Sequence, residues 1–390
     1  MDRKSRNAAS RNIILVGTLP FQSNNFTYTD GQCEAFKALI DVLSKNNFQN
    51  LAILNVLRRT NIQNKNIIFK SIELLSKLLM VAIKIFFTPK KSILYITSAQ
   101  SSRGFLRDAF FVAVGLLRNH KVYMHVHGGG IGHAIKNNGW LSRKLAFFIY
   151  NNANKILILH EYYSNMFDAI NISRKKIFVL QNFLNTQDYL LNEKIINNPN
   201  KSLRLLYMSN MIASKGYMIA LDACYELKKR NFKNIKMDFC GNFLDDDMHS
   251  AQENQSKFLQ KISILGLENC VSFHGNVSGS KKTLIFNNAD FFLLPSAYPN
   301  EGIPISIIEA MRYECIVITS DYRALPHMIE NNISGFALNL DGKEIAEKII
   351  QIVKANQVSA LKIKSREYFL ANYSSDAAEE KILKIFSMSD

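Results

Sequence analysis

Short apolar runs alternate with longer amphipathic stretches throughout the chain. The apolar runs begin near residues 13, 51, 92, 121, 156 and 177 in the first half, and near 203, 236, 271, 291, 316 and 335 in the second. Between many of them, apolar residues recur every three or four positions, as on a helix. Buried strands that alternate with helices predict an α/β fold with parallel sheets covered by helices.

One stretch near the middle of the chain interrupts this alternation. Residues 185–201 are rich in asparagine and have no clear period, which predicts an interdomain linker. The length of 390 residues also favours two domains over one. We therefore expect a first domain over residues 1–190 and a second over residues 191–373.

The charge balance narrows the choice of partners. Lys and Arg number 48 against 32 Asp and Glu, so the formal net charge is +16. This excess favours an acidic partner, namely nucleic acid, an anionic membrane surface or a phosphorylated substrate. The alternative is a soluble cationic surface without a dedicated partner. No arginine-rich stripe or aromatic-interleaved sheet motif supports nucleic-acid binding beyond the charge itself.

The cysteines and the apolar segments bear on location. The five cysteines are scattered without a C-x-x-C pair, which predicts reduced thiols in a cytosolic protein. The run Ile13–Val16 is too short for a signal peptide. The most apolar region, residues 67–87, contains Lys70, Glu73, Lys77 and Lys84, so we do not expect it to span a membrane.

Residues 67–87 instead predict an amphipathic helix. Their apolar positions recur at helical spacing: Ile68, Ile72, Leu75, Leu79, Ile83 and Phe86. Such a basic helix can lie on an anionic bilayer, and the alternative is a helix packed on its own sheet.

Residues 289–320 combine two carboxylates with a strand–loop–helix pattern. The run Phe291–Leu294 predicts a buried strand, and a turn-rich loop with Glu301 follows it. Glu309 lies about one turn into the next helix, which starts near Ser306. Carboxylates suit a ligand rich in hydroxyl groups, and a helix N-terminus suits a phosphate. Together these features predict a nucleotide-sugar site.

Two further positions predict contacts to phosphate. Lys215 precedes the helix predicted over residues 217–230, where a cation is unfavourable unless an anion is bound. It is not a Walker A lysine, because the required glycine spacing is absent, and a solvated surface lysine is the alternative. Gly31 stands just ahead of another predicted helix, where glycine lets a ligand approach the backbone or simply forms a turn.

Histidines surround a glycine run in the first half. His125 and His127 lie on the same face of a predicted strand, and His133 is near in sequence. A metal triad is one interpretation. The favoured one places His127 at the strand's end, facing a cleft as a polar or proton-handling group. Residues 128–130 fail the dinucleotide-binding spacing, and the acidic run 245–247 is interpreted as a solvated loop rather than a cation site.

Three blocks together resemble a known family. Glu301 and Glu309 in PNEGIPISIIEAM resemble an E-x7-E signature, YMSNMIASKG resembles a strand–loop block ending in Lys-Gly, and HVHGG resembles a histidine-bearing strand end. In this order they resemble retaining nucleotide-sugar glycosyltransferases of family GT4. The resemblance covers roughly residues 11–385 and implies a GT-B fold, with two Rossmann-like domains facing each other across a cleft. It also implies that the helix over about 374–390 packs back on the first domain.

The resemblance implies a role for each matching residue. Glu301 would contact the transferred sugar, Glu309 the ribose hydroxyls and Lys215 the diphosphate, while His127 would lie near the reacting side of the sugar. The remaining donor-binding and diphosphate-loop positions implied are Asn210, Gly241, Val277, Gly302, Ile303, Pro304, Ile305 and Gly31. No metal and no cofactor is expected, because Lys215 and a helix dipole would replace a cation.

The sequence also departs from the family pattern. Ser209 and Asn210 replace a Gly-Arg pair, Glu314 replaces a small residue, and His327 replaces a glutamate. A second cation at the diphosphate is therefore in doubt, although Asn210 could donate a hydrogen bond.

The function expected from these observations is transfer of a sugar, with retention, from a nucleotide sugar to a glycan or lipid-linked glycan. Such a reaction fits bacterial capsule, O-antigen or lipopolysaccharide synthesis in the cytoplasm, with the basic helix at the inner face of the membrane. An epimerase or hydrolase of the same fold is the first alternative, and a basic nucleic-acid-binding protein is the second.

Overall fold

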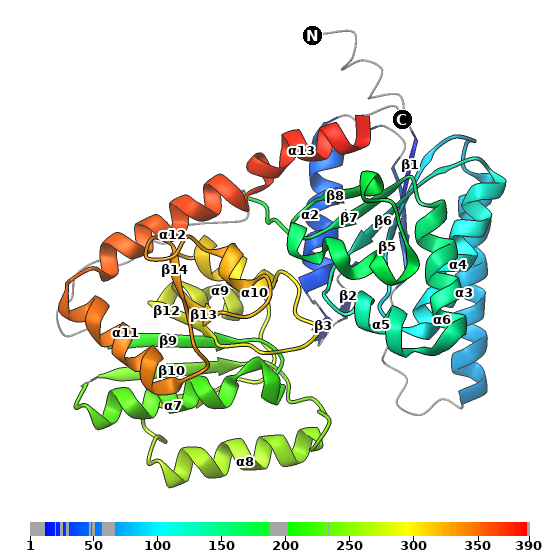
Figure 1. The fold of residues 1–390 in the computed structure, drawn as a ribbon. Coiled ribbons are helices and arrows are strands. Elements are labelled where there is room, and N and C mark those ends of the chain that lie inside the picture. Colours follow the sequence, from blue (N-terminus) through cyan, green and yellow to red (C-terminus); the bar gives the residue numbers. More distant parts are fainter. Residues whose placement is uncertain are drawn as a thin grey trace. The chain divides into compact units, whose positions relative to one another are not determined.

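The computed structural model describes residues 12–19, 21–23, 26–28, 31–46, 48, 51–56, 67–186, 202–232 and 234–387. The chain divides into two compact units, one formed by residues 1–183 with 378–390 and the other by residues 184–377 (Figure 1). Residues 187–201 of the predicted linker lie outside the described residues. We call the two parts unit 1 and unit 2.

Unit 1 contains a six-stranded parallel sheet in the order β4-β1-β5-β6-β7-β8. Each strand is a short apolar run, as expected for a sheet that is buried on both faces. The strands are β1 (Ile13–Gly17), β4 (Leu51–Asn55), β5 (Ile93–Thr97), β6 (Lys121–Val126), β7 (Lys155–Ile158) and β8 (Ile177–Val179). A separate antiparallel hairpin, β2 (Phe21–Ser23) with β3 (Phe26–Tyr28), was not predicted.

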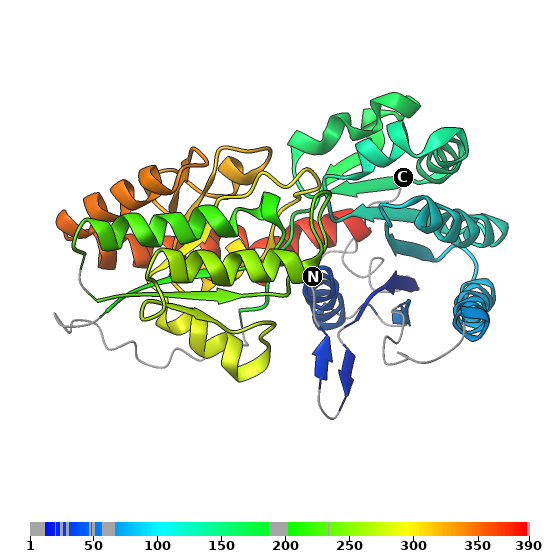
Figure 2. The same ribbon diagram turned by 90° about the horizontal axis from the view of Figure 1, so that it is seen from below.

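Helices cover both faces of the unit 1 sheet. The helices α3 (Ile67–Phe87), α4 (Ser102–Leu117) and α6 (Gly139–Asn152) form one layer, in which α4 contacts both of the others (Figures 1 and 2). Gly115 of α4 packs against Leu94 of the sheet. The short elements α5 (Ile131–Asn137), η1 (Glu161–Ile170) and η2 (Arg174–Lys176) complete this unit.

The opposite face of this sheet carries α2 (Gly31–Lys45) and the last helix, α13 (Ser375–Ser387). Ile382 and Phe386 of α13 are fully buried in the same cluster as Phe36 of α2 and Tyr95 of β5. Lys155 is also buried, and its ammonium donates a hydrogen bond to the Ile385 carbonyl at 2.6 Å. The C-terminal residues are therefore part of the core of unit 1.

We expect Ile382→Val to lower the free energy of unfolding of unit 1 by about 1 kcal/mol, because it removes one buried methylene. The matched control is Ile83→Val on α3, where the side chain is 55% exposed and the change should be close to zero. Urea unfolding followed by fluorescence of Trp140, the only tryptophan of the chain, reports on unit 1. Equal values for both variants would mean that α13 does not contribute to this core in solution.

Unit 2 contains a second six-stranded parallel sheet, in the order β11-β10-β9-β12-β13-β14. The strands are β9 (Leu203–Met208), β10 (Ile235–Cys240), β11 (Val271–Phe273), β12 (Phe291–Leu294), β13 (Ile316–Ser320) and β14 (Gly335–Leu338). Numbered within the unit this is the Rossmann order 3-2-1-4-5-6. The chain reverses its direction of travel between β9 and β12, and ligands bind such sheets outside the carboxyl ends of the strands at this switch point.

The helices of unit 2 also lie on both faces of its sheet. The helix α7 (Tyr217–Lys229) packs against α11 (Gly342–Lys354), and α10 (Ile305–Arg312) packs against α12 (Val358–Asn372). The remaining helical elements are η3 (Ala213–Lys215), α8 (Ala251–Ile264), α9 (Gly279–Asn288) and η4 (Leu325–Met328). Among the described residues, no helix is both long enough and apolar enough to cross a membrane.

Candidate active site

The switch point of unit 2 brings together two of the predicted site residues. Lys215 ends the loop after β9, and Glu301 lies in the loop after β12, 86 residues later. These strands are neighbours in the sheet, and the Ala297 amide donates to the Ser214 carbonyl at 2.7 Å between the two loops. The Lys215 Nζ atom lies 3.2 Å from Oε1 of Glu301. The fold therefore creates an ion pair at the edge where a parallel sheet binds ligands.

Both partners of this pair are enclosed. The side chains of Glu301 and Lys215 are 5% and 13% exposed. Ser296, which is itself fully buried, donates a hydrogen bond of 2.7 Å to Oε2 of Glu301. The Lys215 ammonium also lies 5.0 Å from the ring centre of Tyr298. A buried carboxylate needs such partners, because desolvation is costly without them.

Tyr207 of β9 supports the loop that carries Lys215. Its hydroxyl group lies 3.3 and 3.4 Å from the backbone carbonyl oxygens of Asn210 and Lys215 and shares its one proton between them. Burial, and secondly the negative charge of Glu301, raise the pKa of Tyr207 well above its usual value. The phenol therefore keeps its proton and remains a donor at neutral pH.

Two glycines allow the loops at this edge to approach each other closely. Gly216 has a φ of +78°, and a Cβ atom there would lie 1.9 Å from the carbonyl oxygen of Pro295. Gly241 has a φ of +142°, and a Cβ atom there would lie 1.8 Å from the carbonyl oxygen of Ser209. Neither position can hold a side chain unless the backbone moves. The packing of the loops therefore requires glycine at position 241, in addition to its predicted role at the donor.

Glu309 lies on α10, about one turn after the loop that carries Glu301. Its Oε1 atom is 2.5 Å from Nζ of Lys282 on α9. The side chains of Lys282 and Glu309 are 24% and 14% exposed, so the pair is partly shielded from water. Lys282 was not predicted as a site residue, because nothing in the sequence pattern of α9 indicates that it faces α10.

The other predicted donor-binding residues follow the carboxyl ends of neighbouring strands. Asn210 follows β9, Gly241 follows β10 and Val277 follows β11, with Asn210 exposed and Val277 buried. Gly302, Ile303 and Ile305 are buried, and Pro304 caps α10, which begins at Ile305. Because the side chains of Ile303 and Ile305 are buried, these two positions can offer a ligand mainly their backbone.

His127 and Gly31 belong to unit 1. Gly31 is the exposed first residue of α2. His127 immediately follows β6, and its Nδ1 atom lies 3.1 Å from Oδ1 of Asn182, which is buried. Since an amide oxygen only accepts hydrogen bonds, Nδ1 of His127 is the donor. Asn182 was not predicted as a site residue, because it lies just beyond the end of β8 in a stretch without a recognisable motif.

His125 is uncharged and held on both sides. Its Nε2 donates to the Leu180 carbonyl at 3.1 Å, so its Nδ1 accepts from the Tyr95 hydroxyl at 2.6 Å. Burial, and secondly the neighbouring His127, hold the pKa of His125 well below its usual value. The ring centres of His125 and His127 are 4.0 Å apart. Because both nitrogens of His125 are engaged, this ring does not serve the metal triad that was considered as an alternative.

The acidic run 245–247 has local hydrogen-bonding roles. Asp246 accepts from the amides of Met248 and His249, and these bonds, that of Met248 above all, lower its pKa. Asp245 accepts from the Ala251 amide at the start of α8. Within the described part of the chain, no cluster of three or more His, Cys, Asp or Glu side chains is arranged to hold a metal ion.

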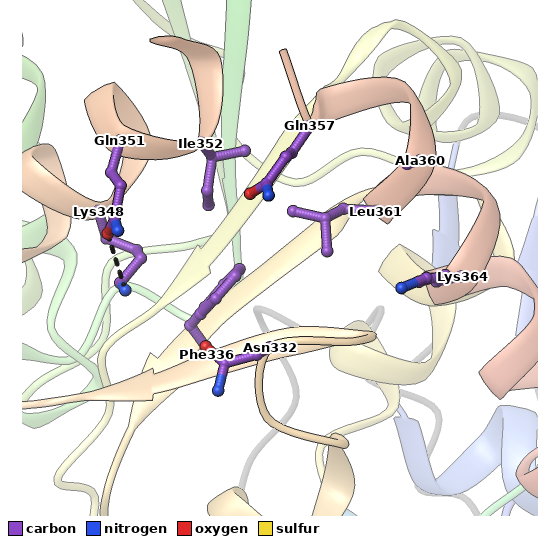
Figure 3. Close-up of a pocket in the computed structure, with 9 residues that line it drawn as sticks. All are labelled: Asn332, Phe336, Lys348, Gln351, Ile352, Gln357, Ala360, Leu361 and Lys364. Carbon is purple, nitrogen blue, oxygen red and sulfur yellow. Dashed lines mark hydrogen bonds between the residues drawn. The ribbon is translucent and has the colours of Figure 1, made fainter. Parts of the chain in front are cut away.

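A hollow of about 280 Å³ lies elsewhere in unit 2, between β14, α11 and α12 (Figure 3). Phe336, Ile352 and Leu361 form its apolar part, and Lys348 donates a hydrogen bond of 3.1 Å to Gln351 at its rim. None of the predicted site residues lines this hollow. The ion pair at the switch point is therefore the better candidate for an active site.

Comparison with known families supports this choice. Residues 190–372, nearly all of unit 2, match the family model described as "Glycosyl transferases group 1". Unit 2 is a group 1 glycosyltransferase domain. The recognition of this family is thereby confirmed, and the E-x7-E and Lys-Gly blocks lie within the matched residues.

Two curated relatives of this chain are named for polysaccharide biosynthesis. The chain is 28% identical over 138 residues to the amylovoran biosynthesis glycosyltransferase AmsK of Erwinia amylovora. The aligned residues cover 34% of this chain and 31% of AmsK. It is 27% identical over 208 residues to the capsular polysaccharide biosynthesis glycosyltransferase CapH of Staphylococcus aureus. Here the aligned residues cover 51% of this chain and 56% of CapH. The matches therefore span about a third and somewhat more than half of these relatives.

Solved structures of glycosyltransferases share the fold of this chain. Anabaena HepE, determined in complex with UDP and glucose, superposes with a TM-score of 0.68 over 97% of this chain and 100% of its own, at 14% identity. At that identity the likeness establishes the fold alone. The predicted α/β fold class of GT-B type, with two parallel sheets flanked by helices, is confirmed.

Proposed function

We propose that this group 1 chain is a retaining glycosyltransferase that moves a sugar from a nucleotide-sugar donor to a glycan or lipid-linked glycan. The observation that carries the proposal is the buried Lys215–Glu301 pair at the switch point of unit 2. A cation and a carboxylate at this edge match the two parts of such a donor, its diphosphate and its hydroxyl groups.

Lys215 is proposed to stabilise the diphosphate as it leaves. Negative charge grows on the leaving oxygen when the sugar–phosphate bond breaks, and a fixed ammonium group in a partly dry site lowers the energy of that state. The carbonyl bonds from Tyr207 and the contact with Glu301 hold the Lys215 segment before the donor arrives. The first turn of α10, with the amide N–H groups of Gly302, Ile303 and Ile305, is proposed to add its dipole at the same phosphates.

Glu301 is proposed to accept hydrogen bonds from the transferred sugar, and Glu309 from the ribose. Asn210, Gly241 and Val277 are proposed to border the nucleotide. His127 is proposed to contact the transferred sugar from unit 1, oriented by Asn182, and Gly31 to contribute a backbone approach to diphosphate or acceptor. The reaction is proposed to need no metal, because Lys215 and the helix dipole supply positive charge at the diphosphate.

The acceptor is proposed to belong to a bacterial surface polysaccharide such as a capsule. Two observations support this: the relatives AmsK and CapH are named for amylovoran and capsular polysaccharide synthesis, and the chain carries a strong excess of positive charge. We propose a cytoplasmic enzyme that works at the inner face of the membrane, where lipid-linked acceptors are held.

Labelled nucleotide sugars test this function. We first expect one nucleotide sugar from a panel to raise the apparent melting temperature, because a ligand that binds only the folded state stabilises it. Label from that donor should then appear in a lipid-linked glycan with the anomeric configuration retained, and EDTA should not change the rate. Label found only in free sugar would indicate a hydrolase, and label in a second nucleotide sugar would indicate an epimerase.

Glu309→Ala should raise the KM for the donor about tenfold and change kcat less than threefold, because contacts to the ribose are the same in substrate and transition state. The Lys282 partner complicates this variant, since its ammonium loses an ion pair of 2.5 Å. Steady-state kinetics with varied donor concentration provide the measurement, and Lys282→Met provides the control. A similar rise in KM for Lys282→Met would show that the ion pair matters for donor binding, and a loss of kcat alone in Glu309→Ala would contradict the assigned role.

A further inference from the structure

The positive charge of the chain belongs entirely to unit 1. Residues 1–183 and 378–390 contain 27 Lys and Arg against 11 Asp and Glu, which gives +16. Residues 184–377 contain 21 of each and have no net charge. The excess is therefore unrelated to the proposed donor site in unit 2, although the donor is itself an anion. It requires an explanation within unit 1.

Ten of these sixteen excess positive charges lie in a single segment of the chain. Residues 67–150, which include α3, α4, α5 and α6, contain 12 Lys and Arg but only two acidic residues. Both acids are paired with neighbours on their own helices, Glu73 with Lys77 at 3.3 Å and Asp108 with Arg107 at 2.6 Å. Cations therefore outnumber acids in this stretch by ten.

The apolar stripe of α3 faces outward. The predicted positions that the structure describes, Ile72, Leu75, Leu79, Ile83 and Phe86, are each between 41% and 58% exposed. A different flank of the helix, with Val81, Ala82 and Ile85, is buried. The side chains of Ile68 and Lys70 lie outside the described residues. The helix therefore packs on its own unit through this second flank. The periodic stripe, for which contact with a bilayer was the other interpretation, stays uncovered.

Exposed apolar side chains continue onto the neighbouring helices. Leu106 and Leu117 of α4 and Trp140 and Leu141 of α6 are between 56% and 74% exposed. Cations accompany them: Arg118 lies 4.9 Å from the ring centre of Phe86, and Lys144 lies 4.8 Å from that of Trp140. Figures 1 and 2 show α3 and α4 side by side, in agreement with their contacts. We call the exposed side chains of α3, α4 and α6 the basic apolar face.

We propose that the basic apolar face docks on an anionic lipid bilayer, with α3 lying along the surface. Such a helix buries leucine, isoleucine and aromatic side chains in the acyl boundary while its lysines contact the headgroups. It therefore binds both through the hydrophobic effect and through electrostatic attraction to the anionic lipids. Nucleic acid would use the cations but would leave the apolar stripe in water. A second copy would use the apolar stripe but would bring two strongly cationic surfaces together. Only a bilayer satisfies both features.

Vesicle flotation tests the proposal with the full chain. We expect the protein to float with vesicles of equal parts phosphatidylglycerol and phosphatidylcholine, not with pure phosphatidylcholine, and to be released in about 0.5 M salt. Leu79→Ser combined with Ile83→Ser should weaken binding at least about tenfold, since these side chains provide the apolar contribution. The matched control is Leu259→Ser with Ile264→Ser on α8 of unit 2, a pair that is 48% and 74% exposed against 46% and 55% on α3.

Equal flotation of the two double variants would overturn the proposal, as would equal binding of the native chain to uncharged vesicles. A concentration-dependent dimer that the α3 variant abolishes, without vesicle binding, would assign the face to a second copy. Binding to a DNA duplex that the α3 variant retains would assign the cations to nucleic acid. Donor-induced thermal stabilisation should be the same in both variants. If no donor stabilised the native chain or either variant, that result would count against the proposed function and would not affect the inference of bilayer binding.

Discussion

Lys215→Ala is expected to lower kcat by about 10²–10³-fold, the cost typical of removing one preorganised charge or donor at a developing anion. The donor should still bind, because Glu309 and the loops around α10 are unchanged. The effect falls on kcat because the leaving diphosphate gains negative charge only as its bond to the sugar breaks. The Lys215 ammonium therefore stabilises the transition state more than the bound donor. kcat and KM for the donor, measured by release of the labelled nucleotide, distinguish this effect from a loss of binding.

The same variant should also lose stability, and this needs its own control. Glu301 is 5% exposed, so removing Lys215 leaves a buried carboxylate with one partner fewer, at a cost of about 3 kcal/mol. Lys215→Met combined with Glu301→Gln removes both charges and should recover most of the stability while remaining inactive. Lys354→Ala, at an exposed position of the same unit, should change neither property. Recovery of activity in the double variant would mean that Lys215 acts only through folding.

The strands were predictable because a parallel sheet buries both of its faces. Phe291–Leu294 is a continuous apolar run, and its observed bounds equal the predicted ones. Helix α3 was likewise predicted over residues 67–87. The β2–β3 hairpin was missed, since residues 21–28 alternate too briefly to indicate strands.

The meeting of Lys215 with Glu301 depends on strand order, which a single sequence does not reveal. A chain of six strands can be ordered in several ways, and only the adjacency of β9 and β12 joins their two loops. Supporting residues were missed for the same reason: Tyr207 resembles any core tyrosine of a strand, and Asn182 any loop asparagine. The two flanks of α3 are a further case, because periodicity identifies an apolar stripe but does not say which apolar flank packs.

Gly216→Ala is expected to destabilise unit 2 strongly. The residue follows Lys215 directly, and its φ of +78° costs an alanine about 1 kcal/mol even in open space. The added Cβ would also lie 1.9 Å from the Pro295 carbonyl oxygen, a backbone atom that cannot turn away as a side-chain end could. The loop with Lys215 and the loop with Glu301 must then separate, so we expect a loss of about 4 kcal/mol or more in unfolding free energy.

Gly266→Ala separates the two causes of this loss. Its φ of +61° carries the same conformational cost, but the nearest atom to its added Cβ is the flexible end of Lys228 at 3.7 Å. We therefore expect a loss of only about 1 kcal/mol for this control, with unchanged donor kinetics. Urea unfolding and donor-induced thermal stabilisation of both variants provide the comparison. Similar losses in the two would mean that the loops after β9 and β12 are not packed together, and the Lys215–Glu301 pair would then lose its structural basis.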